Sequence, residues 1–258
     1  MNRSILLNFA KQDLIDRYSG SILGGIWSFI IPLVNILIFA LVFSKIMGAK
    51  LPFNSAELSE YGYSIYLVSG ILAWNAFANI LLRTTNIYKE KAGLIAKVNI
   101  NLMLLPLYII MTESVIFIIS MGFFIIFLYL VDFPLNPYWL LIPIIYLLQT
   151  LFAYALGLLL ATLSVFIKDI REFISIMLQL WFWFTPIVYV ISILPDKLVY
   201  WFQLNPMYPI ISAYRDIILM AQWPDMTAMS LFFIMASSLL FVSITLLKKL
   251  EKDLRDFI

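Results

Sequence analysis

Residues 133–167 read FPLNPYWLLIPIIYLLQTLFAYALGLLLATLSVFI, a stretch without a single charged side chain. The hydrocarbon core of a bilayer is about 30 Å thick, and an α-helix that advances about 1.5 Å per residue crosses it in about 20 residues. The quoted stretch is long enough for one such helix after a turn at its start. It therefore predicts an all-α integral membrane protein.

Outward from this stretch, five more runs have the length of a membrane span. Proline and asparagine in residues 132–137, DFPLNP, predict a tight turn before the quoted span. The run that precedes this turn carries one charge, Glu113. Together the runs predict six transmembrane helices, one within the quoted stretch and the others within residues 26–44, 61–82, 98–131, 173–194 and 226–247.

The composition of the chain agrees with a membrane protein and argues against several kinds of site. Hydrophobic residues make up 63% of the 258 positions and charged residues 12%, against about 25% charged residues in a soluble domain. There is no histidine, the commonest general base, and no cysteine for a thiolate metal ligand. We expect neither a metal site nor a bound cofactor in this chain.

Lysine and arginine predict the orientation of the helices, because these residues are enriched in cytoplasmic loops. With the N-terminus inside, 13 of the 17 Lys and Arg residues fall on the cytoplasmic side, and only Lys45, Lys50, Lys197 and Arg215 fall outside. We therefore expect both termini in the cytoplasm. Without an internal repeat, residues 1–258 read as one domain, with an interface helix at 1–21, a six-helix membrane domain at 22–247 and a cytoplasmic tail at 248–258.

Two segments outside the spans have patterns of their own. Ile5, Leu6 and Phe9 lie on one helical face within residues 2–21, which predicts an amphipathic helix on the inner membrane surface, with a disordered tail as the alternative. Residues 198–224 are too short and too interrupted by proline to cross the bilayer. They fit two short re-entrant helices that dip into the outer leaflet, or an external loop.

Five short motifs occur in order along most of the chain. They are DLIDRY (13–18) with SILG (21–24), Trp27 and Pro32-Leu33; LIAKV (94–98) with Leu105-Pro106; FIKDI (166–170); FTPIVY (184–189); and NPMYP (205–209). This order resembles the transmembrane (permease) subunit of ABC-2 type polysaccharide exporters, the Wzm family that exports O antigens. Lys168 departs from the arginine that the family usually has before the aspartate.

The resemblance implies a permease of an ATP-driven exporter that moves a lipid-linked polysaccharide of the O-antigen type across a bacterial cytoplasmic (inner) membrane. The chain has no Gly-x-x-x-x-Gly-Lys-Ser/Thr phosphate loop, so we expect no enzyme activity of its own. ATP and Mg are expected in a separate Wzt-like ATPase, with two copies of that subunit on a homodimer of this chain. Export of capsule or teichoic-acid polymer stays open as an alternative.

Two alternatives come from other classes of protein. A secondary transporter or channel that works alone typically has ionisable residues in several spans and inverted repeats, whereas the predicted spans contain only Glu113 and no repeat. A membrane-embedded transferase needs clustered acids or a metal near the interface, and the acids predicted outside are dispersed.

Candidate channel-lining residues lie in the first and fifth predicted spans. Asn35 shares a helical stripe with Phe39 and Phe43, and an amide at mid-membrane faces protein or a cavity rather than lipid. Residues 181–184, WFWF, start about 12 Å into the fifth predicted span, where their rings pack or offer weak contacts to a sliding sugar polymer. The set is Asn35, Phe39, Phe43, Trp181, Trp183, Phe184 and Tyr189.

Glu113 has two readings within the third predicted span. A buried acid is stabilised when it is protonated or hydrogen-bonded, which gives it a structural role. The other role is proton coupling. The predicted spans argue against it, because they contain no lysine, arginine or histidine that could form a relay with Glu113.

Two further sets of residues follow from the cytoplasmic loops and the family motifs. Leu94 and Ile95 are apolar in a polar loop, which predicts docking into a partner groove, or contact with the bilayer surface as the alternative. The candidate ATPase-coupling residues are Asp13, Arg17, Lys91, Leu94, Ile95, Lys97, Lys168 and Asp169. The resemblance suggests a periplasmic gate at Asn205, Pro206, Tyr208 and Pro209.

Overall fold

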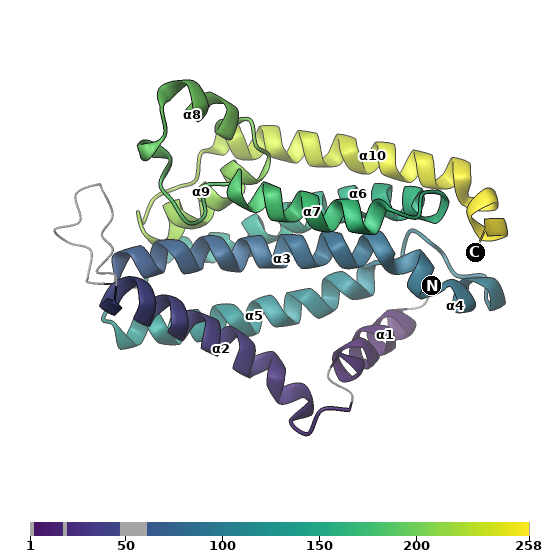
Figure 1. Cartoon of the computed structure of the whole chain (residues 1–258), viewed down its shortest axis with the longest axis horizontal. Coiled ribbons are helices and arrows are strands. Elements are labelled where there is room, and N and C mark those ends of the chain that lie inside the picture. Colours follow the sequence, from purple (N-terminus) through teal and green to yellow (C-terminus); the bar gives the residue numbers. More distant parts are fainter. Residues whose placement is uncertain (1–2, 18–19, 47–60, 258) are drawn as a thin grey trace.

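The structure is a computed structural model that describes residues 3–17, 20–46 and 61–257. Within these ranges every regular element is a helix (Figure 1). The elements are α1 (Arg3–Asp16), η1 (Gly24–Ile26), α2 (Trp27–Phe39), η2 (Ala40–Ile46), α3 (Gly62–Glu90), α4 (Ala92–Lys97), α5 (Leu107–Leu130), η3 (Pro137–Leu141), α6 (Ile142–Phe166), α7 (Ile170–Trp183), η4 (Ile191–Ile193), α8 (Asp196–Gln203), α9 (Met207–Ile218) and α10 (Met226–Phe257). Residues 1–2 and 18–19 of the predicted interface helix, which include Tyr18 of the first motif, lie outside the described residues.

Five helical segments among the described residues are long and apolar enough to cross a membrane. They are Gly24–Phe43, Gly62–Glu90, Leu107–Leu130, Pro137–Phe166 and Met226–Phe257. The five coincide with five of the six predicted spans, and α3 and α10 continue beyond the predicted ends at residues 82 and 247. Most of the predicted cytoplasmic tail is therefore part of the long helix α10.

The remaining predicted span, residues 173–194, is not one continuous helix. α7 has 14 residues and ends at Trp183, and an irregular stretch follows as far as Val190. Pro186 explains the break, because proline lacks the N–H of the helical ladder and disfavours a helical residue before it. At about 1.5 Å per residue, α7 is about 21 Å long. Six continuous membrane spans are therefore not confirmed.

α3 is the central helix of the bundle. It packs against α5, α6, α7 and α9, and Figure 1 shows it running lengthwise through the molecule. α6 and α3 meet closely at Gly157, where an added Cβ atom would lie 2.8 Å from Thr84. Small residues allow membrane helices to approach in this way. α2 differs from α3, because most of its side chains are exposed in the single chain.

Two short helices, α8 and α9, lie between α7 and α10, as predicted for residues 198–224. α9 is mostly buried, with Met207, Ile211 and Tyr214 fully covered. Asn136 in the turn before α6 donates a hydrogen bond of 2.8 Å to the carbonyl of Ile217. α9 is thus part of the packed protein and is not an external loop.

Candidate coupling and translocation site

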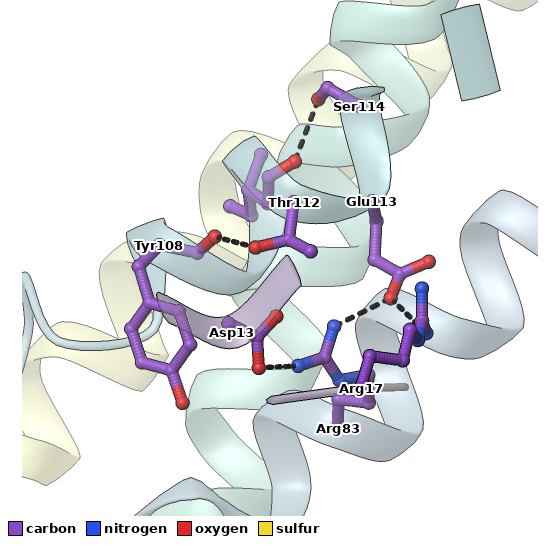
Figure 2. A network of polar contacts seen from close by, with 8 residues as sticks. Asp13, Arg17, Arg83, Tyr108, Thr112, Glu113 and Ser114 are labelled. Carbon is purple, nitrogen blue, oxygen red and sulfur yellow. Dashed lines mark hydrogen bonds and ion pairs between the residues drawn. The ribbon is translucent and has the colours of Figure 1, made fainter. Parts of the chain in front are cut away.

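Four charged side chains from three parts of the chain meet near one end of the bundle (Figure 2). Arg83 of α3 lies between two acids: its Nη1 donates to Oε1 of Glu113 at 2.6 Å, and its Nη2 donates to Oδ1 of Asp13 at 2.5 Å. Arg17, which follows α1, donates to the same Oε1 of Glu113 at 2.8 Å. We call these four residues the ion network.

The ion network joins α1 to two membrane-spanning helices. The Glu113 side chain is 1% exposed, and those of Asp13, Arg17 and Arg83 are between 20% and 26% exposed. Charge-assisted hydrogen bonds of this kind are stronger than neutral ones. The two acids and two arginines sum to zero net charge, so the network is compensated within itself.

The sequence-based view of Glu113 needs a correction. α5 begins at Leu107, so Glu113 lies only six residues, or about 9 Å, from that end of the helix. The second span was predicted to end at residue 82, with Arg83 on the cytoplasmic side, but α3 continues to Glu90. No basic residue was expected within the spans, yet the longer α3 brings Arg83 to Glu113, and Arg17 binds the same carboxylate.

A cavity of about 130 Å³ lies beside the ion network, between α2, α3 and α5. Asn35 and Phe39, two of the predicted channel-lining residues, line it together with Glu113. Two more amides line the same cavity, Asn75 and Asn79 of α3. The cavity therefore has a polar wall in the middle of two spans.

At the other end of α3, the irregular stretch after α7 is held by hydrogen bonds to its carbonyl groups. Each carbonyl from residue 183 to residue 189 accepts one. The donors are, in order, the hydroxyl of Tyr189, the amide of Asn205, the backbone N–H of Ile187, two nitrogens of Arg215, and the hydroxyls of Tyr63 and Tyr66. Non-helical backbone is tolerated at membrane depth where protein satisfies its polar groups.

Arg215 of α9 is the main support of this stretch. Its Nη1 donates to the carbonyl of Pro186 at 2.7 Å and its Nη2 to that of Ile187 at 2.9 Å. The guanidinium lies 3.5 Å from the ring centre of Tyr66, a favourable cation–π contact. An added Cβ at Gly70 would lie 3.0 Å from Nη2, so this position leaves room for Arg215. No carboxylate among the described residues pairs with Arg215.

Asn205, a predicted gate residue, joins α7 to the start of α9. Its Oδ1 accepts from Nε1 of Trp181 at 2.7 Å and from the N–H of Met207 at 3.0 Å. Its Nδ2 donates to the carbonyl of Phe184 at 2.9 Å. Pro206 and Pro209 stand at the N-cap and in the first turn of α9, where proline is tolerated.

The predicted aromatic channel residues do not form one lining. Trp181 packs against Phe77, with ring centres 5.2 Å apart, and thus belongs to the core. Trp183 and Phe184 are 61% and 59% exposed. Of the other three, Phe39 lines the cavity between α2, α3 and α5, Phe43 contacts the ring of Tyr63, and Tyr189 contacts that of Phe202.

The predicted coupling residues outside the ion network lie in α4 and in the segments next to α3, α4, α6 and α7, near the end of the bundle where Figure 1 shows α4 and the end of α10. Lys168 and Asp169 are exposed, and the carbonyl of Lys168 accepts a bond from Lys89 at 3.3 Å. Lys97 is also exposed, and Lys91 lies over the ring of Tyr108 at 5.8 Å.

The two apolar residues of α4, Leu94 and Ile95, differ in how deeply they are buried. Ile95 is buried inside the chain against residues that include Tyr88 and Leu102, so it is not free to dock into a partner. Leu94 is partly buried on the same cluster. Internal packing therefore explains Ile95, and a docking role stays a prediction for Leu94 and its exposed neighbours.

Four residues of the site were not singled out from the sequence. Arg83 and Arg215 were counted only for orientation, and Asn75 and Asn79 were not considered. The signal was available, because Asn75, Asn79 and Arg83 are spaced by four and share one face of a helix without glycine or proline between residues 71 and 91.

Comparisons with known proteins agree with this architecture. The ABC-2 type transporter family matches residues 6–219. The chain is 26% identical over 251 residues to the O-antigen export system permease protein RfbA of Myxococcus xanthus, covering 93% of this chain and 92% of the relative. It is 27% identical over 214 residues to the protein of the same name from Klebsiella pneumoniae, covering 83% and 79%.

Proposed function

The chain belongs to the ABC-2 type transporter family, and from that premise we propose that it is the permease of an ATP-driven exporter of a lipid-linked polysaccharide of the O-antigen type. The observation that carries the proposal is the alignment over 93% of this chain with a relative named as an O-antigen export permease. An alignment of this extent includes the membrane-spanning helices as well as the short motifs.

In this proposal the energy for export comes from a partner. The sequence has no phosphate loop, so ATP and Mg²⁺ belong to a Wzt-like ATPase at the cytoplasmic end of the bundle. Two copies of that subunit bind a homodimer of this chain in the bacterial inner membrane. The distribution of lysine and arginine supports cytoplasmic termini.

The ion network is the mechanical link between the ATPase and the spans. An ATPase that moves α1 also moves Asp13 and Arg17, and these residues hold Arg83 of α3 and Glu113 of α5. Because Glu113 is buried, breaking one pair leaves a poorly compensated charge, which costs about 3–5 kcal/mol in other buried pairs. That cost keeps the three helices moving as one unit.

The opposite end of the bundle, at the stretch after α7, faces outward in this proposal. It provides a fixed surface along which the polymer moves. Asn205 and Arg215 hold the stretch after α7 in one shape through its carbonyl groups. The exposed rings of Trp183 and Phe184 offer flat apolar faces to sugars without a fixed polar partner. Weak contacts of this kind suit a polymer that has to slide.

The proposal is tested in a host strain from which this gene is deleted. Restoring the chain together with its ATPase is expected to restore surface polysaccharide, and an ATPase with its phosphate-loop lysine replaced by alanine is expected to restore none. The control is a matched expression level of the chain in both strains. Export that continues with the inactive ATPase would show a solitary transporter instead.

A further inference from the structure

Three asparagine side chains on α2 and α3 line one cavity. Asn35, Asn75 and Asn79 are exposed in the single chain, and none of the three side chains makes a hydrogen bond to any residue that the structure describes. Two polar side chains of neighbouring helices behave differently. Ser120 bonds to a carbonyl of its own helix, and Gln149 bonds to the carbonyl of Ala73.

The depth of these amides makes their exposure informative. Asn75 is at the centre of α3, and Asn35 is near the middle of the span Gly24–Phe43. A free amide at mid-membrane is costly against lipid, because hydrocarbon offers no hydrogen bonds. This wall therefore faces a polar occupant and not the lipid chains.

The chemistry of the wall suits a sugar. An amide carries both donors and an acceptor, as a sugar hydroxyl does, so each asparagine can exchange two hydrogen bonds with vicinal hydroxyls. Glu113 adds an acceptor, because both arginines bind its Oε1 and its Oε2 has no hydrogen bond to the described residues. Phe39 and Phe117 line the same cavity and supply apolar faces.

Size and charge narrow the class of ligand. The cavity of about 130 Å³ is close to the about 150 Å³ that admits one benzene ring, so it has room for one six-membered ring and not for a length of polymer. The ion network at its inner end sums to zero charge, so the wall has no excess of either sign. An uncharged sugar ring matches the wall better than an acidic one.

We infer that this cavity is a saccharide-binding site that receives one neutral sugar unit of the exported polymer at a time, through Asn35, Asn75 and Asn79. The inference rests on the proposed function and adds to it the class of sugar and the residues that read it. Hydrogen bonds that replace those to water contribute little net free energy, so the polymer binds without being trapped.

Substitution of the amides tests the site in the full exporter. Asn35→Leu, Asn75→Leu and Asn79→Leu are each expected to lower the export rate about threefold to tenfold, the effect of losing about one hydrogen bond. The amount and the oligomeric size of the purified chain are expected to stay unchanged. The matched control is Ser238→Leu, which removes an exposed polar group from α10 that bonds only to its own helix.

Two outcomes of this experiment overturn the inference. The first is a triple leucine variant that exports at the wild-type rate. The second is a variant that no longer forms the wild-type oligomer, because the amides would then hold two copies of the chain together. If the wild-type chain with its ATPase exports no polysaccharide at all, the proposed function fails instead.

A labelling experiment tests binding itself. The chain has no cysteine, and Ile71 lines the cavity, so Ile71→Cys gives a single reactive thiol there. The host's own polysaccharide, freed of its lipid by mild acid, is expected to slow the reaction of this thiol with a water-soluble reagent. Adding Asn75→Leu is expected to remove the protection. Equal labelling with and without the polysaccharide would overturn the inference.

Discussion

The two ends of α3 bury charge in opposite ways. At one end, Arg83 binds Asp13 and Glu113, Arg17 binds Glu113 as well, and every charge in the ion network has a side-chain partner of opposite sign. At the other end, the partners of Arg215 among the described residues are backbone carbonyls and the ring of Tyr66. The first arrangement joins separate helices, while the second holds one irregular stretch in shape. Variants of the ion network should therefore change coupling, and variants around Arg215 should change stability.

The largest effect on stability is expected from Arg215→Met. This change leaves the carbonyls of Pro186 and Ile187 without these hydrogen bonds, and each unsatisfied buried carbonyl costs about 1–3 kcal/mol. The free energy of unfolding should therefore fall by about 2–6 kcal/mol. Thermal unfolding of the purified chain in detergent measures it. Lys197→Met, which removes an exposed cation from α8, is the control and should have little effect. If Arg215→Met keeps the wild-type melting temperature and exports normally, Arg215 does not hold the stretch after α7 in shape.

A smaller effect on stability but a large effect on coupling is expected from Glu113→Gln. The variant keeps the size of the side chain and weakens two charge-assisted bonds, so unfolding should become easier by about 1.5–3 kcal/mol. Export per folded molecule should fall about tenfold, because about 1.4 kcal/mol of lost coupling is a factor of ten, while ATP hydrolysis continues.

The control for Glu113→Gln is Asp256→Asn, which neutralises an exposed acid near the end of α10. Export and ATP hydrolysis measured on the same vesicles separate coupling from the amount of protein. If Glu113→Gln lowers the melting temperature as much as Arg215→Met and leaves export per folded molecule unchanged, the two ends do not differ in the way proposed.

The smallest effects distinguish two neighbouring tryptophans. Trp181→Phe loses the hydrogen bond to Asn205 and core contacts, so stability should fall by about 1–2 kcal/mol. Trp183→Phe alters an exposed ring and should stay within about 0.5 kcal/mol. Chemical unfolding of both variants measures the difference. Equal losses at the two positions would mean that Trp183 is also packed, for example against a second copy.

The apolar runs were enough to predict most of the fold. Long apolar stretches with at most one charge predicted five helices correctly, because a membrane span is selected by length and hydropathy. The run from Phe173 to Leu194 fitted the same rule but contains Pro186, and backbone chemistry ended the helix there. Its missing helical bonds are supplied from α3 and α9, which no local pattern reveals.

The candidate site was only partly predictable. Asp13, Arg17 and Asn205 were singled out by motif, and Asn35 by its depth, but their partners lie far away in sequence. The second span was predicted to end at residue 82, before Arg83, because a charge was taken to end a span. A charged residue whose side chain pairs with an opposite charge, as Arg83 pairs with Glu113, can lie inside a helix and does not have to end it. Pairs of residues that meet only through tertiary packing are beyond a reading of one sequence.

The proposed role of the ion network is to tie α1 mechanically to the spans. Phe9 of α1 and Tyr108 of α5 have ring centres 5.7 Å apart, close to the network but outside it. A short, reducible bifunctional thiol reagent can join cysteines at these two positions in a chain without native cysteine. The tether is expected to leave export by the otherwise unchanged chain intact.

The most direct measurement is export by the Phe9→Cys, Tyr108→Cys, Glu113→Gln chain before and after cross-linking. If the network is a mechanical tie, the covalent link replaces it, and export should rise from the low level of Glu113→Gln towards that of the same double-cysteine chain with Glu113 intact. Reduction of the link should lower export again. Export that stays low after complete cross-linking would show that the ion network is not a mechanical tie between α1 and the spans.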